Sequence, residues 1–259
     1  MNKSTVTLTL IGGPTVLIET GGLRLLTDPT FDPPGYYQSG PVTLKKKAGP
    51  ALSIAEIGHV DAVLLSHDQH ADNLDPAGRA LIGDIPTVLT TRIGAERLGG
   101  TTRGLSPWDT IEIKGAGGAK LNVTATPARH GPVGIEPMTG DVIGFLLGID
   151  KPGDLIYVTG DTVWYEGVAE VARRYQPRLV ILFAGSAKTA RGPFHLTMDS
   201  NDAIETAYAF KGAQIVAVHT DGWAHFTESG EDLAKAFGAL GLGRRLQVLK
   251  AGMTVPVAL

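Results

Sequence analysis

The chain has 259 residues, enough for one large α/β domain or two small ones. Hydrophobic residues make up 43% and charged residues 19%, and the net charge of −3 gives no reason to expect a nucleic-acid-binding surface. The chain contains no cysteine, no signal-like segment and no apolar run long enough to span a bilayer, so we expect a cytoplasmic protein without disulfides, thiolate ligands or a membrane partner.

The first half of the chain is predicted to open with β-strands and to continue with strands and helices in alternation. Three β-rich runs begin it, at 5–11, 15–20 and 23–26. The proline-rich segment 28–50 is expected to be a long ordered loop, and loops of that length are usually functional. The later elements expected in this half are a strand at 60–65, a helix at 75–81, a strand at 87–90, a helix at 93–98 and strands at 110–113 and 121–126.

The second half repeats this order. Its expected elements are strands at 142–149 and 155–158, a helix at 163–175, a strand at 179–183, a helix at 199–210, a strand at 215–218, a helix at 229–240 and a strand at 246–249. Antiparallel strands thus open each half and β-α-β units close it, which favours two packed sheets with helices outside. We predict one domain, 1–259, with pseudo-equivalent halves of about 1–130 and 131–259.

A dense group of polar side chains follows the buried strand predicted before Ser66. Within ten residues, Ser66 to Asp75, the chain places two imidazoles, three carboxylates and two amides. Capping of the next helix would need only one of these side chains. Closely spaced nitrogen and oxygen donors at the end of a rigid strand are typical of a metal site.

Three further donors follow apolar runs elsewhere in the chain: His130, Asp161 and His219. Each alone is weak evidence, because a lone polar residue at a strand end is more often structural. Strand ends at one edge of a sheet can converge, however, and together the four groups offer enough donors for two divalent ions.

With these motifs the chain resembles the metallo-β-lactamase superfamily of metal-dependent hydrolases. In that family a His-x-His-x-Asp-His motif is followed by a His, a Gly-Asp and a last His, in the order seen here, and Thr27-Asp28-Pro29 resembles its first motif. The likeness is nearest to the branch that contains ascorbate-6-phosphate lactonase. It implies an α/β fold, a four-layer αββα sandwich of two mixed sheets with helices outside.

The resemblance leaves two registers for the first ligand. Alternation along an extended strand end puts residues 68, 70 and 72 on one face and favours Asp68, while the other register makes His67 the first ligand. The favoured first site is Asp68, His70 and His130, with Asp161 bridging to a second site that also contains Asp72, His219 and, as a weak neutral ligand, Asn73. We expect one or two divalent ions per chain, Zn²⁺ or, because oxygen donors replace imidazoles, Mn²⁺.

Other polar residues have candidate roles around the metal. Asp28 is either a turn-forming residue or a partner that steadies a ligating His. Asp72 would ligate or orient the attacking water and carry its proton. His195 is a candidate oxyanion stabiliser or substrate contact, the alternative being a His packed near a helix start. His225 is expected at the pocket rim, as a candidate ligand or ligand partner.

The substrate pocket is expected to draw on aromatic and basic residues outside the metal motifs. Tyr36, Tyr37 and Trp223 are candidate wall residues, although aromatic residues are more often core. Arg129 and Lys188 are candidates to receive an anionic group of the substrate, the alternative being ordinary surface charge.

The expected function is hydrolysis of a small molecule, a lactone or related ester, by a hydroxide that the metal generates when it lowers the pKa of water from about 15.7 to about 7. Two alternatives stay open: a phosphodiesterase of the same fold and a non-catalytic metal-binding protein. The resemblance to lactonases also favours a homo-oligomer.

Overall fold

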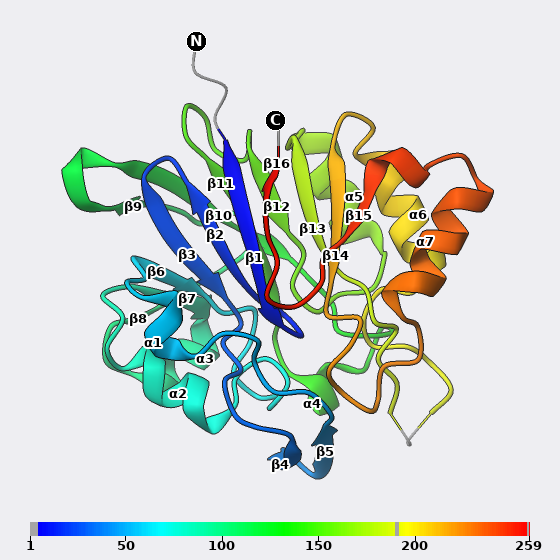
Figure 1. Cartoon of the computed structure of the whole chain (residues 1–259), viewed down its shortest axis with the longest axis horizontal. Helices are drawn as coiled ribbons and strands as arrows, with labels where there is room; N and C mark the ends of the chain where they lie inside the picture. Colours follow the sequence, from blue (N-terminus) through cyan, green and yellow to red (C-terminus); the bar gives the residue numbers. More distant parts are fainter. Residues whose placement is uncertain (1–4, 190–191, 258) are drawn as a thin grey trace.

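The computed structural model describes residues 5–189, 192–257 and 259 of the chain. Two seven-stranded sheets form its middle (Figure 1). In the first sheet the strands around β1 and β2 are antiparallel, and parallel pairing begins between β3 and β6. Across this sheet the strands are β16 (Thr254–Val257), β1 (Val6–Gly12), β2 (Thr15–Thr20), β3 (Leu23–Thr27), β6 (Ala62–Leu64), β7 (Val88–Thr91) and β8 (Thr102–Leu105).

The second sheet has the same mixed character. Its strands β12 to β15 pair in parallel, whereas β9, β10, β11 and β12 pair antiparallel to their neighbours. Across this sheet the strands are β15 (Leu246–Val248), β14 (Gln214–Val218), β13 (Leu179–Phe183), β12 (Ile156–Val158), β11 (Ile143–Gly148), β10 (Lys120–Pro127) and β9 (Thr110–Lys114).

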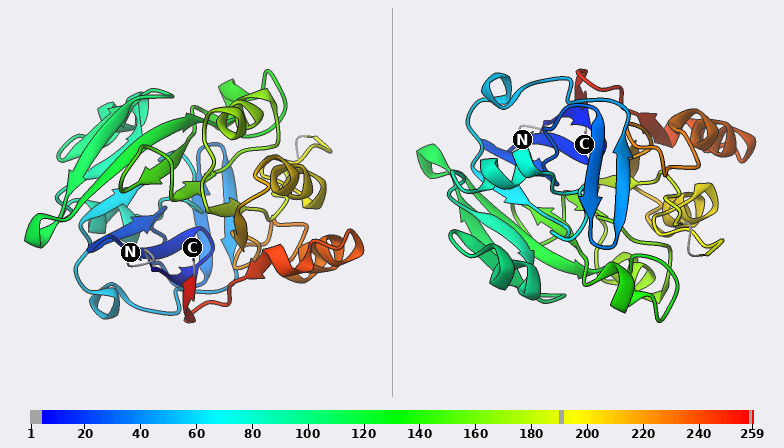
Figure 2. Two further views of the ribbon diagram at one scale, coloured as in Figure 1. Left: turned by 90° about the horizontal axis from the view of Figure 1, so that it is seen from above. Right: turned by 90° about the horizontal axis from the view of Figure 1, so that it is seen from below.

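Helices cover the outer face of each sheet, which gives four layers (Figure 2). The first sheet carries α1 (Ile54–Ile57), α2 (Pro76–Ile82) and α3 (Arg92–Leu98), and the second carries α5 (Glu166–Arg174), α6 (Ser200–Ala209) and α7 (Gly230–Ala239). Short elements in the connections are α4 (Glu136–Thr139) and the 3₁₀ turns η1 (Ala116–Gly118) and η2 (Gly243–Arg245). None of the helices among the described residues is long and apolar enough to cross a membrane.

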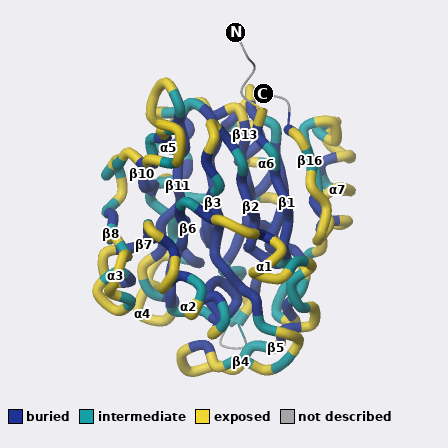
Figure 3. Tube along the Cα trace, turned by 60° about the vertical axis from the view of Figure 1, so that its left-hand side comes forward, coloured by how far each residue is buried: buried dark blue, intermediate teal, exposed yellow. Residues whose placement is uncertain are grey.

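Three apolar clusters hold the layers together. The largest fills the space between the sheets, where side chains such as Leu8 and Phe145 are almost completely buried. The central strands β1, β2 and β3 are accordingly buried along most of their length (Figure 3). A second cluster joins the second sheet to α5, α6 and α7, for example through Val168 and Phe237. The third joins the first sheet to α1 and α2, with Ile57 and Ile82. Burial on both faces explains why strands such as β13 are apolar at every position. The four-layer sandwich expected from the sequence is confirmed.

The structure differs from the expected elements in two places that matter for function. The segment expected to be a loop at 28–50 contains a two-stranded hairpin, β4 (Gly35–Ser39) and β5 (Val42–Lys46), which projects from one edge of the molecule (Figure 3). The changeover between sheets falls between β8 and β9, earlier than the expected boundary near residue 130. The last strand, β16, returns to the first sheet beside β1.

Candidate metal centre

Four strand ends deliver the candidate ligands to one edge of the sandwich. Strands β10, β12 and β14 run in the same direction, because β11 is antiparallel to both β10 and β12 while β12, β13 and β14 are parallel. Their carboxyl ends therefore lie at one edge, and His130, Asp161 and His219 follow them. The loop after β6, in the first sheet, brings His67, His70 and Asp72 to the same place.

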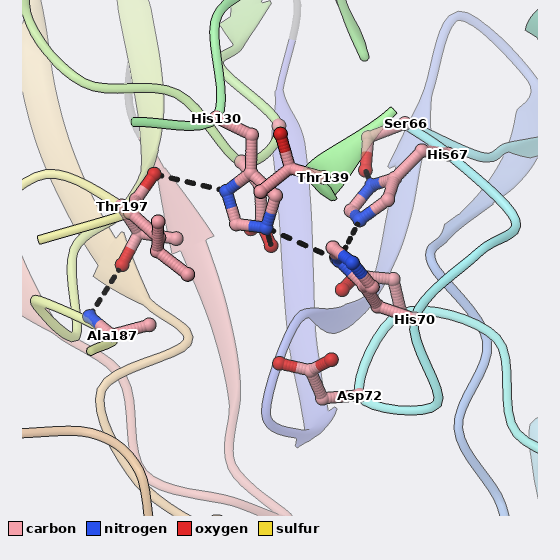
Figure 4. A network of polar contacts seen from close by, with 12 residues as sticks. Ser66, His67, His70, Asp72, His130, Thr139, Ala187 and Thr197 are labelled. Carbon is pink, nitrogen blue, oxygen red and sulfur yellow. Dashed lines mark hydrogen bonds and ion pairs between the residues drawn. The ribbon is translucent and has the colours of Figure 1, made fainter. Parts of the chain in front are cut away.

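The first group of ligands consists of three imidazoles, His67, His70 and His130. The Nε2 atom of His67 lies 2.8 Å from Nδ1 of His70, and the Nε2 atom of His130 lies 3.2 Å from the same Nδ1 (Figure 4). A tetrahedral zinc ion with bonds of about 2.0–2.1 Å holds its nitrogen ligands roughly 3.3 Å apart. The three rings are thus spaced nearly as they would be around one ion.

The outer nitrogens of two of these rings fix their tautomers. Nδ1 of His130 lies 2.9 Å from the carbonyl oxygen of Leu196, which only accepts, so this nitrogen carries the proton. Nδ1 of His67 lies 2.9 Å from Oγ of Ser66, whose own proton is donated to Asp28 at 2.7 Å, so it too donates. In the neutral rings both Nε2 atoms therefore direct lone pairs at His70.

Burial keeps the rings of His67 and His70 uncharged. It holds the pKa of His67 well below its ordinary value, and the neighbouring His70 lowers it further. Burial, followed by the charge of His130, lowers the pKa of His70 to about 4. Imidazole nitrogens whose lone pairs point at one another cannot form hydrogen bonds with each other, but together they can bind a cation.

The second group consists of Asp72, Asp161 and His219, all buried. Nδ1 of His219 lies 3.0 Å from Oδ1 of Asp161, and its Nε2 lies 3.6 Å from Oδ2 of Asp72. Within the described part of the chain, Oδ2 of Asp161 and Nε2 of His219 have no hydrogen-bond partner. Buried polar atoms are rarely left in this state, so these two call for a ligand.

The charged side chains of this second group strongly shift one another's pKa values. Burial would lower the pKa of His219, but the carboxylates of Asp161 and Asp72 outweigh it and raise that pKa to about 10. Burial would raise the pKa of Asp72, but His225 and His219 outweigh it and hold the pKa well below its usual value. Without metal, a protonated His219 supplies positive charge beside the two buried carboxylates, and a divalent cation bound there would replace that proton. The donor atoms in each group lie within 4.8 Å of one another, so the residues present fit one or two divalent ions.

Local backbone geometry shows how the chain delivers these side chains. His219 has φ 58° and Asp28 has φ 30°, values rare for residues other than glycine. Gly160 precedes Asp161 with φ 62°, and a Cβ at this position would lie 2.8 Å from Cβ of Ser66 and 2.7 Å from the Ile143 carbonyl oxygen. Only glycine fits here, so the Gly-Asp pair is a packing requirement between the two sheets.

The expected place of Asp68 beside His70 and His130 is not found. Both carboxylate oxygens of Asp68 accept hydrogen bonds from the guanidinium of Arg97 in α3, and His67 takes its place in the cluster. The alternation argument fails because β6 ends at Leu64, so the following residues are not extended strand. The side chain of Asn73 is not grouped with either cluster: its Nδ2 donates to Asp28 at 3.1 Å.

Asp28 supports the first cluster through Ser66. Its two carboxylate oxygens accept the Ser66 backbone N–H at 2.6 Å and the Ser66 hydroxyl at 2.7 Å. Burial raises the pKa of Asp28 to about 7 in spite of these hydrogen bonds. The chain Asp28, Ser66, His67 thus orients a ligand ring. Ser66 was not singled out in the sequence, although its place directly before His67 was a usable signal.

The two histidines expected near the pocket have different surroundings. Nε2 of His225 lies 2.9 Å from Oδ2 of Asp72, at the edge of the second cluster. His195 instead turns to the start of α6, where its Nε2 lies 3.1 Å from Asp202 and its Nδ1 lies 3.6 Å from Asp199. Its neighbour Leu196, not His195, faces the cavity and accepts the hydrogen bond of His130.

A cavity of about 250 Å³ opens beside the clusters. His70, Asp72, His130 and His225 line it, together with residues of the β4–β5 hairpin, α4 and the segment after β13, Lys188 among them.

Of the five residues expected at the substrate pocket, Lys188 lines this cavity, whereas the lining does not include Tyr36, Tyr37, Trp223 or Arg129. Trp223 is buried against Gly13 and Tyr37, while Tyr36 is exposed under Lys45. Arg129 stacks its guanidinium 4.4 Å from the ring centroid of Tyr165. Core packing, the alternative weighed for the aromatic residues, describes Trp223 but not Tyr36, which is 71% exposed. Arg129 is half-buried and not an ordinary surface charge. The walls of the cavity come from the hairpin and α4, which the sequence did not predict as elements.

Comparison with known proteins agrees with this architecture. Residues 23–220 match the family model described as a beta-lactamase superfamily domain. The chain is 25% identical to the UPF0173 protein YddR of Bacillus subtilis (strain 168) over 248 residues, 87% of this chain and 90% of that protein. It is 29% identical over 192 residues to a UPF0173 metal-dependent hydrolase of Herpetosiphon aurantiacus, 71% of this chain and 73% of that protein.

A solved structure shares the whole fold. The isothiocyanate hydrolase from Delia radicum gut bacteria superposes with a TM-score of 0.81 at 22% identity, covering 97% of this chain and 99% of that one. The chain therefore belongs to the metallo-β-lactamase superfamily of metal-dependent hydrolases, as the resemblance in sequence implied.

Proposed function

We propose that this protein opens a lactone or hydrolyses a related small ester with the help of bound divalent metal. The observation that carries the proposal is the meeting of two ligand clusters, one of three imidazoles and one of two carboxylates and an imidazole, beside a cavity of about 250 Å³. The cavity is smaller than the range of about 300–1,000 Å³ typical for drug-sized ligands, which favours a small substrate.

We further propose zinc for the three-imidazole cluster. His67 occupies the place that the sequence suggested for Asp68, so all three donors of this cluster are nitrogens. Imidazole donors suit zinc. The cluster of Asp72, Asp161 and His219 has two oxygen donors and suits either zinc or manganese.

A divalent cation held by these residues would supply Lewis-acid chemistry, by making water acidic enough to attack at neutral pH and by polarising the substrate oxygen. Asp72 faces the cavity with its pKa held low, so it is ionised and able to accept the proton of the attacking water. His225 lies 2.9 Å from Asp72 and also lines the cavity. This contact places His225 to take the proton that Asp72 accepts and to pass it on toward the leaving oxygen.

The lining favours a carboxylic ester over a phosphodiester. Phosphoryl groups are usually held by several arginine or lysine side chains, whereas Lys188 is the one lysine or arginine among the described residues that line this cavity.

The test is hydrolysis by the purified protein loaded with Zn²⁺ or Mn²⁺. The panel contains γ- and δ-lactones, p-nitrophenyl esters, a β-lactam, an isothiocyanate and bis(p-nitrophenyl) phosphate. We expect lactone or ester hydrolysis that disappears with chelator and in Asp72→Ala. His225→Gln should keep its metal and lose about 10²–10⁴-fold in kcat, as for a lost proton-transfer group. His59→Gln is the matched control, because the ring of His59 is exposed and pairs with Asp61, which belongs to neither cluster.

Other outcomes would change the assignment. Preference for the phosphodiester would replace the lactonase by a phosphodiesterase. A fully metal-loaded protein that is inert across the panel would favour a metal-binding protein without catalysis.

A further inference from the structure

Residues of two elements, the β4–β5 hairpin and α4, contribute most of the apolar lining of the cavity beside the metal clusters. The hairpin lies across this face of the molecule, as the view from below shows (Figure 2). The side chains on this apolar side are Pro41, Val42, Leu44, Ile135, Met138 and Leu196.

Two of these side chains have an accessibility that is unusual for their type. Val42 is 38% exposed and Met138 is 42% exposed, although both line the cavity. Exposed apolar surface gathered around a concave site marks a place where an apolar group binds. The hairpin that carries Val42 is held in position, because Oγ of Ser39 accepts the backbone N–H of Ala71 at 3.1 Å and Lys46 pairs with the buried Asp75 at 2.9 Å.

We propose, on the basis of the function proposed above, that the substrate carries a short apolar substituent that lies between β5 and α4, with Val42 and Met138 as specificity-determining residues. The reacting carbonyl then lies near Asp72 and His225, which line the same cavity. The substituent is short because the cavity of about 250 Å³ is smaller than the range of about 300–1,000 Å³ typical of sites for drug-sized ligands.

Each buried methylene group contributes about 0.8 kcal/mol, which is about a fourfold change in an equilibrium constant. In a series of p-nitrophenyl esters from acetate to octanoate, we therefore expect kcat/KM to rise up to fourfold per methylene and to level off once the cavity is filled. The rise should come mainly through KM, because the contact is the same in the ground state and the transition state.

Charged substitutions test the two walls. Val42→Asp and Met138→Asp should flatten this dependence on chain length, so that octanoate loses its advantage over acetate. Because both side chains are already partly exposed, neither substitution removes packing from the core. Val133→Asp is the matched control: Val133 is 82% exposed, lies just before α4 and does not line the cavity. It should keep the wild-type dependence.

Binding of hexanamide, measured by NMR titration of the metal-free protein, separates this inference from the proposed function. Hydrolysis of esters with a flat dependence on chain length in the wild type would overturn the inference and leave the hydrolase intact. If no ester is hydrolysed, hexanamide binding that is weakened by Val42→Asp and Met138→Asp would support the apolar subsite alone. Absence of hexanamide binding in that case would overturn it.

Discussion

Ser66 is the residue through which a buried carboxylate acts on a candidate ligand. Its hydroxyl donates to Asp28 and accepts from Nδ1 of His67, so it determines which nitrogen of that ring faces the cluster. Removing the hydroxyl leaves both buried partners without their hydrogen bonds.

We expect Ser66→Ala to weaken binding of the first metal ion about 10–100-fold, the range found when such supporting hydrogen bonds are lost. Competition with a chromophoric chelator measures the affinity, and Ser66→Thr, which keeps the hydroxyl, should restore most of it. Equal affinity for the alanine and threonine variants would show that the hydroxyl does not orient His67.

His67 and Asp68 are adjacent in the chain and have opposite surroundings, which makes them a sharp test of the ligand set. His67 faces His70, whereas Asp68 pairs with Arg97. We expect His67→Ala to reduce the zinc affinity by at least tenfold and Asp68→Asn to leave it nearly unchanged, because only the first removes a donor from the cluster. Elemental analysis after gel filtration gives the metal content of both. Loss of metal in Asp68→Asn with retention in His67→Ala would reverse the assignment.

At the scale of elements, the β4–β5 hairpin depends on one buried ion pair. The ammonium of Lys46 at the end of β5 is 4% exposed and the carboxylate of Asp75 is fully buried. Asp75 also accepts the backbone N–H groups of Phe31, Asp32 and Gly78, so it joins the hairpin, the segment after β3 and the start of α2.

Lys46→Met should lower the free energy of unfolding by about 3–5 kcal/mol, because it leaves the buried carboxylate of Asp75 without its cation. Urea denaturation of the metal-free protein provides the measurement. Lys45→Met, the neighbouring exposed position, should change stability by no more than about 0.5 kcal/mol. If the two variants were equally stable, the three backbone N–H groups alone would have to satisfy Asp75.

The elements that the sequence predicted well are those with strong periodicity and buried faces. β13 was expected at 179–183, where it lies, and α6 and α7 differ from their expected ranges only at the ends. The hairpin and α4 escaped prediction because their side chains are largely exposed and proline interrupts their pattern, so no apolar period marks them.

The residues of the candidate site were also predictable where they lie next to a buried strand. Donors that directly follow a buried strand, such as Asp161 and His219, come together in the structure because the strand fixes their position. The choice between His67 and Asp68 could not be made from the sequence, because it depends on where β6 stops and on Arg97 in a separate helix. The pocket walls could not be foreseen either, since they come from elements that were not predicted.

At the scale of the whole molecule, the clusters lie where the two sheets meet. His67, His70 and Asp72 follow β6 of the first sheet, whereas His130, Asp161 and His219 follow strands of the second. A bound ion would therefore crosslink the two halves of the sandwich, in addition to the apolar core between them.

We expect metal to raise the stability of the whole fold and not of one loop. A ligand that binds only the folded state at 100 times its Kd adds about 2.7 kcal/mol. In a protein of this size each kcal/mol shifts Tm by roughly 2–4 °C, so saturating Zn²⁺ should raise Tm by about 5–10 °C in a single cooperative transition. Scanning calorimetry with and without chelator measures the shift, and His67→Ala should lose most of it. If Tm were the same with and without metal, the ion could not be held jointly by side chains from both sheets, since unfolding of the sandwich necessarily separates them.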